Sequence, residues 1–272
     1  MYNFYYYSND IFLMKLSIIT CTYNSEKYLA GCIQSLITQN LNVNDFEHIF
    51  VDAFSSDSTI NIINEYKNNH TTHNINLIRS KPQWVYNAMN TWIKQAKGEY
   101  IYILNSDDTI YEKWLLDLLN YTIDTEIDFC FWNTYFVDKY GKLLGKLKPN
   151  SLMKFLFYLW CYRFGLIIYN YICPQSLLYK KIIHDQLWYY SENFKYLSDR
   201  EFSIKVMSST YVIWYLDSFI SNFLHHNDSL TSNIHNRNEI YKEATYIWNK
   251  YYRYYLWSIR VLLVKFLRLF LT

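Results

Sequence analysis

Two adjacent carboxylates, Asp107 and Asp108, follow an apolar run in the stretch YILNSDDTIY at residues 102–111, with Asn105 and Ser106 just ahead of them. Mg²⁺ and Mn²⁺ prefer oxygen ligands and usually take one or two carboxylates together with phosphate oxygens of a substrate. The stretch is therefore suited to a site at which such a cation bridges the protein to a diphosphate and neutralises a leaving group. On this stretch alone, an acidic cap of the next helix is an equally good interpretation.

Polar side chains also stand at the ends of three earlier strand-like runs. Thr22 and Asn24 come at the end of the first run, Asp52 closes the second, and Arg79 closes the third. In a parallel sheet the carboxyl ends of the strands lie at one edge, and ligands bind just outside it. Together with residues 105–108, these polar strand ends predict a pocket at that edge.

Strand-like and helix-like segments alternate through the first half of the chain. The predicted strands are residues 16–23, 46–54, 75–80 and 99–108, and the predicted helices are residues 25–39, 55–66 and 85–98. Ser25 is suited to cap the first helix, and Gly98 is the residue type that commonly follows a helix end. The alternation predicts an α/β fold with a parallel sheet covered by helices on both faces.

The pattern changes after residue 115. Residues 128–148 read as strands around a turn at Gly141, and residues 151–173 are almost wholly apolar. Helical spacing returns in residues 192–209, where Asp199 lies near the expected helix start. An acid in that position is commonly explained by the helix dipole alone.

The composition excludes several classes of protein. The chain of 272 residues is 51% hydrophobic and 18% charged, which excludes a disordered protein. The net charge of +2 gives no support to nucleic-acid binding. The five cysteines are odd in number and include no C-x-x-C pair, which predicts reduced thiols in the cytoplasm and no zinc site. The N-terminus lacks the basic-then-apolar order of a signal peptide.

Five segments, in their order and spacing, resemble glycosyltransferase family 2. They are SIITCTYNSEKYLAGCIQSLITQ, EHIFVDAFSSDST, VYNAMNTWIKQAKGEYIYILNSDD, CPQSLLYKK and FKYLSDREFSIKV. The first three cover residues 16–108 and are specific as a set, and the last two cover about 173–206 and are looser. The resemblance implies the GT-A fold, with a Rossmann-like, mixed but mainly parallel sheet. It also implies an inverting enzyme that moves a sugar from a nucleotide-diphosphate donor to a hydroxyl acceptor, in glycan or polysaccharide biosynthesis.

The resemblance implies donor-binding roles at the strand ends. Thr22 and Asn24 match nucleotide contacts of the family's first strand, and Asp52 matches an acid that hydrogen-bonds the nucleotide base. Arg79 follows the third strand and is suited to meet the donor phosphates, as is Lys81, although a solvated charge explains either one equally well.

The resemblance also implies a metal motif and a catalytic base. Asn105, Ser106 and Asp107 match a D-x-D motif in which Asn105 replaces the first acid, so Asp107 is the expected ligand of Mn²⁺ or Mg²⁺, with Asp108 beside it. Asp199 matches the family's base. Removal of the acceptor proton by a positioned carboxylate accelerates such a reaction roughly 10²–10⁴-fold.

Three features depart from the family pattern. Ala53 and Phe54 stand where glycine or small polar residues are usual, and Asn87 replaces an acid that is common there. The loop at residues 223–232 lacks the usual glycines, and its His225 or His226 is a candidate for contact with the diphosphate or metal. Surface histidines are the commoner explanation. Trp84 is a candidate for the edge of the sugar pocket, although tryptophan at a helix start more often serves packing.

The C-terminal stretch 248–272 contains no acid. Its five charged residues are Lys250, Arg253, Arg260, Lys265 and Arg268. On a helix with about 100° per residue, they fall within an arc of roughly 140°, and leucines lie largely on the opposite face. This pattern is typical of a helix that lies on an anionic membrane surface, and charge interrupts it too often for a spanning segment. A helix packed on its own domain and a homodimer contact are the alternatives.

These patterns divide the chain into three parts. We expect residues 1–14 to be an extension, residues 15–235 to be the GT-A domain and residues 236–272 to be a basic amphipathic helical tail. Within the domain, residues 15–115 form the half that binds nucleotide-sugar and residues 116–235 the half that binds acceptor. The expected location is cytoplasmic, peripheral on the cytoplasmic face of a membrane, with a lipid-linked glycan as a candidate acceptor.

Two other functions remain open on the sequence. A nucleotidyltransferase that makes the activated sugar would need a Gly-rich phosphate loop after the first strand, and CTYNSEKYL has none. A non-catalytic sugar-binding or membrane-binding protein of the same fold is the other alternative, and it is kept open by Phe54 and Asn87.

Overall fold

The computed structural model describes residues 14–81, 84–151, 154, 172–226, 229–230 and 233–251. The predicted N-terminal extension, most of the apolar stretch 151–173 and residues 252–272 of the predicted tail lie outside the described residues.

Strands and helices alternate along the first half of the chain, as predicted. The strands are β1 Leu16–Thr22, β2 Phe46–Asp52, β3 Asn74–Arg79, β4 Tyr100–Ile103, β5 Thr109–Ile110, β6 Phe129–Val137, β7 Leu143–Leu147, β8 Leu177–Lys180 and β9 Ile213–Leu224. The helices are α1 Leu29–Ile37, α2 Thr59–Asn69, α3 Val85–Gln95, α4 Leu115–Asp124, α7 Ile182–Leu187 and α8 Ser198–Met207, followed by a C-terminal helix at residues 237–251.

The described residues form one mixed sheet with the strand order β3-β2-β1-β4-β8-β6-β9-β5, and β7 pairs with β6. The first four strands in this order run parallel to one another, which confirms the parallel sheet predicted for the first half. β8 is antiparallel to both β4 and β6, and β9 returns parallel to β6. The mixed α/β architecture of the predicted fold class is therefore confirmed.

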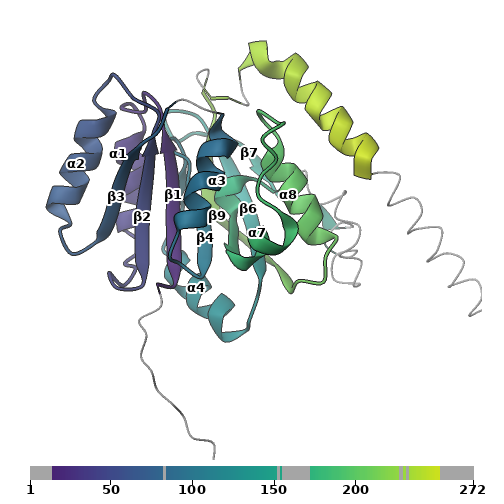
Figure 1. Ribbon diagram of the computed structural model, residues 1–272, viewed down its shortest axis with the longest axis horizontal. Coiled ribbons are helices and arrows are strands. Elements are labelled where there is room, and N and C mark those ends of the chain that lie inside the picture. Colours follow the sequence, from purple (N-terminus) through teal and green to yellow (C-terminus); the bar gives the residue numbers. More distant parts are fainter. Residues whose placement is uncertain are drawn as a thin grey trace, which may run out of the picture.

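Helices cover both faces of the sheet (Figure 1). Side chains of α3, α7 and α8 pack on one face, where Met89, Ile183 and Phe202 meet Ile19 and Ile101. On the other face, α1 and α4 pack against alternate residues of the same strands, and α2 packs beside α1. A strand buried on both faces needs apolar residues at successive positions, and this explains the near-continuous apolar run YIYIL before Asn105.

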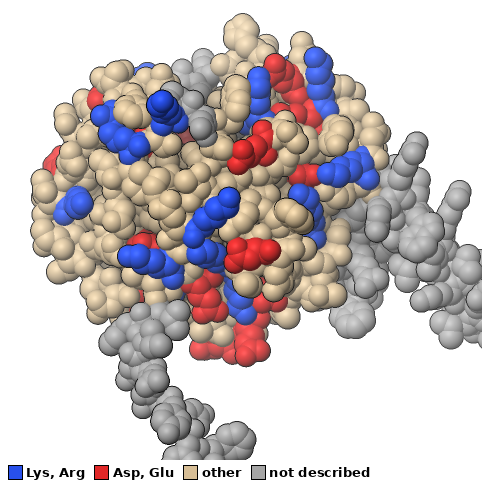
Figure 2. Space-filling model, in the orientation of Figure 1, with Lys and Arg blue, Asp and Glu red and all other residues tan. Residues whose placement is uncertain are grey.

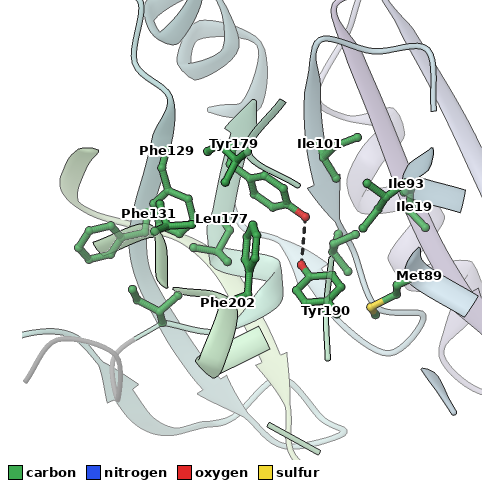
Figure 3. Packing of buried hydrophobic residues seen from close by; sticks show 14 of the residues in the cluster. Ile19, Met89, Ile93, Ile101, Phe129, Phe131, Leu177, Tyr179, Tyr190 and Phe202 are labelled. Carbon is green, nitrogen blue, oxygen red and sulfur yellow. Dashed lines mark hydrogen bonds between the residues drawn. The ribbon is translucent and has the colours of Figure 1, made fainter. Parts of the chain in front are cut away.

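Aromatic side chains fill the core beneath α8. Figure 3 shows Phe202 of α8 beside the rings of Tyr179 and Tyr190, whose hydroxyl groups hydrogen-bond to each other at 3.0 Å. Buried phenol groups need a partner, and each hydroxyl supplies one to the other. This core fixes the start of α8 against α3.

Two local predictions at helix ends were wrong. The first helix begins at Leu29, and the Ser25 hydroxyl lies 2.9 Å from the Ser106 hydroxyl, so it does not cap the helix. α3 ends at Gln95, and Gly98 is required for another reason: a Cβ there would lie 2.3 Å from the backbone nitrogen of Ser17. Gly98 therefore allows the chain entering β4 to approach β1 closely.

The turn predicted at Gly141 lies between β6 and β7, where Gly141 has a φ of +77°. The helix predicted within residues 192–209 is α8, which starts one residue before Asp199. The C-terminal helix lies beside α8 and packs on it through Ile247, with Ile240, Ala244 and Tyr251 adding to the contact (Figure 1). Residues 237–251 are therefore packed on the domain, and of the stretch 248–272, for which this packing was an alternative, only residues 248–251 are described.

Charged side chains of both signs are interspersed among uncharged residues on the face shown in Figure 2. Among the helices of the described residues, none has the length and apolar character needed to cross a membrane. The four described cysteines, Cys21, Cys32, Cys130 and Cys173, are free.

Candidate active site

Three of the predicted donor-binding residues lie side by side at the carboxyl edge of the sheet. Thr22 on β1 is in register with Asp52 on β2, and Asp52 is in register with Arg79 on β3. The chain after β4 continues along the same edge, where the backbone N–H of Leu104 donates to the carbonyl of Ile19. The predicted convergence of polar strand ends is present in the structure.

Asp52 is fully buried and its carboxylate is fully engaged. It accepts hydrogen bonds from the Thr22 hydroxyl at 3.2 Å and from the backbone N–H of Ser55 at 3.0 Å, and the Ser55 hydroxyl also donates to it. The Arg79 guanidinium lies 3.4 Å from the same carboxylate. Asp52 has no exposed surface with which to contact a base, so the geometry assigns it to hold the turn after β2 and to orient Arg79.

Phe54, one of the departures from the family pattern, lies in that turn with a φ of +59°. Its ring is half exposed, and the Arg79 guanidinium lies over it at 4.7 Å from the ring centre. Asn24 also has a positive φ, of +48°, and its side-chain oxygen accepts from the backbone N–H of Ser56 at 2.9 Å. The turns after β1 and β2 are thus tied together, with Phe54, Arg79 and Asn24 at the surface.

The two acids of the opening stretch differ sharply in their surroundings. Asp108 is buried, and its carboxylate accepts from the Asn105 side-chain amide at 2.9 Å and from the backbone N–H of Leu224 at 3.1 Å. Burial, and then the neighbouring charge of Asp107, raise the pKa of Asp108 well above its usual range. Asp108 therefore joins this turn to the end of β9, and its geometry does not support the expected role as a metal ligand.

Asp107 is the partly exposed member of the pair, and it contacts a histidine. The Nε2 atom of His226, in the loop after β9, lies 2.8 Å from the Asp107 carboxylate. The His226 ring packs against the ring of Tyr28, with their centres 4.4 Å apart. Its other ring nitrogen, Nδ1, is buried and has no hydrogen-bond partner among the described residues. His226 is therefore placed beside the motif, as one of the two histidines considered from the sequence.

The side chains present fit a divalent cation only in part. Nowhere in the described portion of the chain do three or more histidine, cysteine, aspartate or glutamate side chains form a group that could hold a metal ion. Asp107 would provide a carboxylate oxygen and His226 an imidazole. Phosphate oxygens and water would then have to fill the other coordination positions of the cation. Mg²⁺ and Mn²⁺ both suit oxygen ligands, so of these two side chains Asp107 is the better suited to either cation.

Asp199 lies in the first turn of α8, almost completely buried at 9% exposure. The Tyr86 hydroxyl, from the first turn of α3, donates to its carboxylate at 2.6 Å and also lies 2.8 Å from the carbonyl oxygen of Tyr196. Burial raises the pKa of Asp199, and the hydrogen bond from Tyr86 acts in the opposite direction. A carboxyl group whose pKa is moved toward neutrality is suited to accept a proton from a substrate.

The metal-motif turn and Asp199 act electrostatically on one buried thiol. Burial raises the pKa of Cys173 to about 12, and the charges of Asp108 and Asp199 both contribute to the rise. Cys173 comes just before the short helix at Pro174–Ser176 that leads into β8.

The acid missing at Asn87 is replaced from another segment. The Asn87 amide donates to the Glu192 carboxylate at 2.8 Å, and the Asn90 amide donates to its other oxygen at 3.2 Å. These two hydrogen bonds lower the pKa of Glu192. A negative charge thus stands beside α3 although Asn87 is neutral.

Trp84 is half exposed just before α3, with the Lys195 ammonium 4.4 Å from its ring centre, and Lys81 is exposed nearby in the chain. Ser106 lies at the same edge through its contact with Ser25.

Sequence reasoning missed Tyr86 and Glu192. Tyr86 stands directly before Asn87 in the quoted family segment, but a tyrosine carries no chemical signal until its partner is known. Glu192 is separated from Asn87 by about a hundred residues, so only the fold brings the two together.

Comparisons with known proteins agree with this architecture. The family model described as Glycosyl transferase family 2 matches residues 17–187. The poly(ribitol-phosphate) beta-glucosyltransferase of Bacillus spizizenii is 35% identical over 143 residues, which make up 52% of this chain and 21% of that protein. TarS of Staphylococcus aureus, a poly(ribitol-phosphate) beta-N-acetylglucosaminyltransferase, is 28% identical over 193 residues, covering 71% of this chain and 32% of TarS.

A solved structure of residues 1–349 of TarS in complex with UDP-GlcNAc superposes with a TM-score of 0.65 at 26% identity. The match covers 81% of this chain and 61% of that one. The chain spans about a fifth to a third of the full length of the two relatives.

Proposed function

Because the chain belongs to glycosyl transferase family 2, we propose that it transfers a sugar from a nucleotide-diphosphate donor to a hydroxyl group of an acceptor, with inversion at the anomeric carbon. One observation carries the proposal: Asp107 is a partly exposed acid beside His226 in the turn after β4, and the buried carboxylate of Asp199 is held in place by Tyr86.

The donor is assigned to the edge formed by β1, β2 and β3. Arg79 is held by Asp52 and is the cation suited to the diphosphate, because a guanidinium binds phosphate oxygens in a fixed, bidentate geometry. Asn24 and Ser106 add polar groups at the same edge, and Thr22 and Asp52 act through the turn that they stabilise. Asp107, with His226 beside it, would hold Mn²⁺ or Mg²⁺, and the cation would supply positive charge to stabilise the departing nucleoside diphosphate.

Asp199 acts as the base. An acceptor hydroxyl is a weak nucleophile, and its proton passes to the Asp199 carboxylate as the oxygen attacks the anomeric carbon. Tyr86 orients the carboxylate through its 2.6 Å hydrogen bond, and burial of Asp199 raises its affinity for the proton. A base on one face of the sugar and a leaving group on the other lead to inversion.

The substrate classes follow from the relatives. TarS binds UDP-GlcNAc in its solved complex, and the names of both relatives give poly(ribitol phosphate) as the acceptor. We assign to this chain a UDP-sugar donor and an acceptor hydroxyl on a phosphate-rich or lipid-linked glycan polymer. The basic stretch 248–272 supports a place on the cytoplasmic face of a membrane, near such an acceptor.

The test is a screen of UDP-sugars and GDP-sugars for Mn²⁺-dependent hydrolysis and transfer. We expect Asp107→Ala to abolish the metal-dependent hydrolysis. Asp199→Asn should lower transfer by roughly 10²–10⁴-fold while the affinity for the donor stays unchanged. Asp117→Ala, which removes an exposed acid from α4, is the matched control.

Three outcomes would count against the proposal. Donor binding without turnover in the wild type would support the non-catalytic alternative. Release of pyrophosphate from a nucleoside triphosphate and a sugar phosphate would support the nucleotidyltransferase. Wild-type activity in both Asp107→Ala and Asp199→Asn would remove these residues from the mechanism.

A further inference from the structure

The backbone just before Asp199 is held by a carboxylate from the C-terminal helix. Glu243 accepts hydrogen bonds from three successive backbone N–H groups, those of Lys195 at 2.7 Å, Tyr196 at 3.1 Å and Leu197 at 3.0 Å. Successive N–H groups that converge on one anion form a strong binding arrangement, and hydrogen bonds to a charged acceptor are about twice as strong as neutral ones. One side chain therefore sets the path of the chain into α8.

The C-terminal helix also binds Glu201, which lies two residues after Asp199. Glu201 is almost fully buried, and its carboxylate meets the Lys250 ammonium at 2.7 Å and the Tyr251 hydroxyl at 3.0 Å. Lys205, one turn further along α8, completes the neutralisation of this buried acid at 3.2 Å. The C-terminal helix thus holds the chain on both sides of Asp199.

Apolar contacts join the two polar attachments. Ile240, Ala244 and Ile247 fall at helical spacing on one stripe of the C-terminal helix, and this stripe packs against Phe194, Leu197 and Ile204. These apolar partners lie on the loop before α8 and on α8 itself. The helix is therefore docked on the segment that carries the base, and Figure 1 shows it lying beside α8.

A hydrogen-bond path leads from Glu243 to Asp199. Glu243 holds the N–H of Tyr196, the carbonyl of Tyr196 lies 2.8 Å from the Tyr86 hydroxyl, and that hydroxyl donates to Asp199 at 2.6 Å. Burial raises the pKa of Tyr86, and the charges of Asp199 and Glu243 are both among the further causes. The Tyr86 hydroxyl is therefore linked directly to Asp199 and, through the backbone of Tyr196, to Glu243.

We propose that the C-terminal helix is part of the catalytic unit and that Glu243 is a positioning residue, which fixes the loop 195–197 so that Tyr86 and Asp199 stay in hydrogen-bonding geometry. The inference rests on the proposed function, in which Asp199 is the base. Glu243 touches no reacting atom in this arrangement and acts through the loop.

The test compares Glu243→Gln with Glu239→Gln. Glutamine has the shape of glutamate, but it lacks the charge, and its NH₂ group cannot accept from the facing N–H groups. Glu239 lies one turn earlier on the same helix, and among the described residues its carboxylate meets the Lys195 ammonium at 3.3 Å and the Tyr196 hydroxyl at 3.5 Å but no backbone N–H of the loop, so it is a matched control. We expect kcat to fall about tenfold in Glu243→Gln and to stay within about twofold in Glu239→Gln, with the donor KM unchanged in both.

A second measurement needs no turnover. The Asp199 carboxyl can be titrated by ¹³C NMR in the absence of substrate, and a loosened loop weakens the Tyr86 hydrogen bond that lowers the pKa of Asp199. We expect the titration midpoint to rise in Glu243→Gln and not in Glu239→Gln. If the wild type shows no transfer activity, the proposed function fails, and this titration still decides whether Glu243 positions Asp199.

Two results would overturn the inference. One is an unchanged Asp199 titration in a folded Glu243→Gln protein, and the other is a loss of kcat that Glu239→Gln matches. If Glu243→Gln does not fold, Glu243→Asp retains the charge on a shorter side chain. The Glu243→Asp protein is expected to fold. Its Asp199 titration midpoint should rise, but by less than the loss of all three Glu243 hydrogen bonds would give. An unchanged Asp199 midpoint in Glu243→Asp would also overturn the inference.

Discussion

At the scale of single residues, the Tyr86 hydroxyl has one proton and two possible acceptors. They are the Asp199 carboxylate at 2.6 Å and the carbonyl of Tyr196 at 2.8 Å. While Asp199 is ionised, the charged acceptor is the stronger of the two. After Asp199 has taken up a proton, its carboxyl can donate to the Tyr86 oxygen, and the tyrosine can donate to the carbonyl. The pair therefore satisfies its hydrogen bonds in both protonation states of the proposed base.

Tyr86→Phe should move the acid limb of the kcat/KM profile to higher pH. Activity requires the ionised carboxylate, so it is lost as pH falls through the pKa of Asp199. Burial already raises that pKa, and removal of the Tyr86 hydrogen bond raises it further. A hydrogen bond to a charged group contributes about 1.5–3 kcal/mol, which corresponds to a shift of about one to two pH units.

The matched control is Tyr190→Phe. The Tyr190 ring is a close neighbour of Tyr86, with centres 5.5 Å apart, but its hydroxyl pairs with that of Tyr179. We expect its acid limb to coincide with that of the wild type. A pH–rate profile for Tyr86→Phe that coincides with the wild type would contradict the role given to this hydroxyl.

Asp107 was a candidate at this scale because it belongs to a pair of carboxylates at a strand end, whereas Asp199 was a candidate only through the resemblance to family 2. Sequence reasoning could not separate Asp107 from Asp108 completely, since the difference depends on the N–H of Leu224, far along the chain. For the same reason Asp52 was expected at a ligand surface, whereas its carboxylate is enclosed by Thr22, Ser55 and Arg79. The chemistry of a side chain is local, but its exposure is set by distant neighbours.

Helices and strands were predicted well in the first half because periodicity and strand-end polarity are properties of adjacent residues. The start of α1 and the reason for Gly98 were missed, since both depend on contacts between elements. The Ser25 hydroxyl turns to Ser106, and Gly98 faces the backbone of β1. The position of β8 between β4 and β6, antiparallel to both, could not be predicted, because a short apolar strand does not indicate its direction or its neighbours.

Gly98→Ala and Gly31→Ala should change stability in opposite directions. The new Cβ at position 98 would lie 2.3 Å from the Ser17 nitrogen and 2.5 Å from the Leu16 carbonyl carbon, and backbone atoms within a sheet cannot move aside cheaply. We expect the free energy of unfolding to fall by about 1–3 kcal/mol or more. Gly31 lies in α1 with no atom within 4 Å of its Cβ position, so alanine there should add about 0.5–1 kcal/mol.

Urea unfolding of both variants, followed by circular dichroism, measures the two changes on the same scale. A Gly98→Ala protein as stable as the wild type would mean that the approach of β4 to β1 is looser than the structure has it.

For the whole molecule, the structure describes the C-terminal region only as far as Tyr251. Residues 237–251 dock on α8, and Lys250, one of the five basic residues counted in the tail from the sequence, is bound to Glu201. The other four, Arg253, Arg260, Lys265 and Arg268, lie outside the described residues, in a stretch without any acid. The sequence pattern of charges did not predict that Lys250 would be bound to an acid of the domain, because Glu201 lies about fifty residues earlier in the chain.

Truncation after Tyr251 should therefore abolish binding to anionic membranes without loss of the proposed catalysis. Every contact described for the C-terminal helix is retained in this variant, including those of Glu243, Ile247 and Lys250. Each basic residue near an anionic surface contributes about 1 kcal/mol, so four of them correspond to a change in partitioning on the order of a thousandfold. Sedimentation with phosphatidylserine-containing vesicles measures the change.

Vesicles of neutral phosphatidylcholine and a full-length variant with glutamine at the four basic positions are the controls, and both should behave like the truncated chain. Raised salt should release the full-length protein, because the attraction acts within a Debye length of the surface. Donor hydrolysis should stay at the wild-type level in the truncated protein, since Asp199, Tyr86 and Glu243 keep their contacts. Equal partitioning of the full-length and truncated chains would remove the membrane role, and a loss of donor hydrolysis on truncation would place part of residues 252–272 in the catalytic unit.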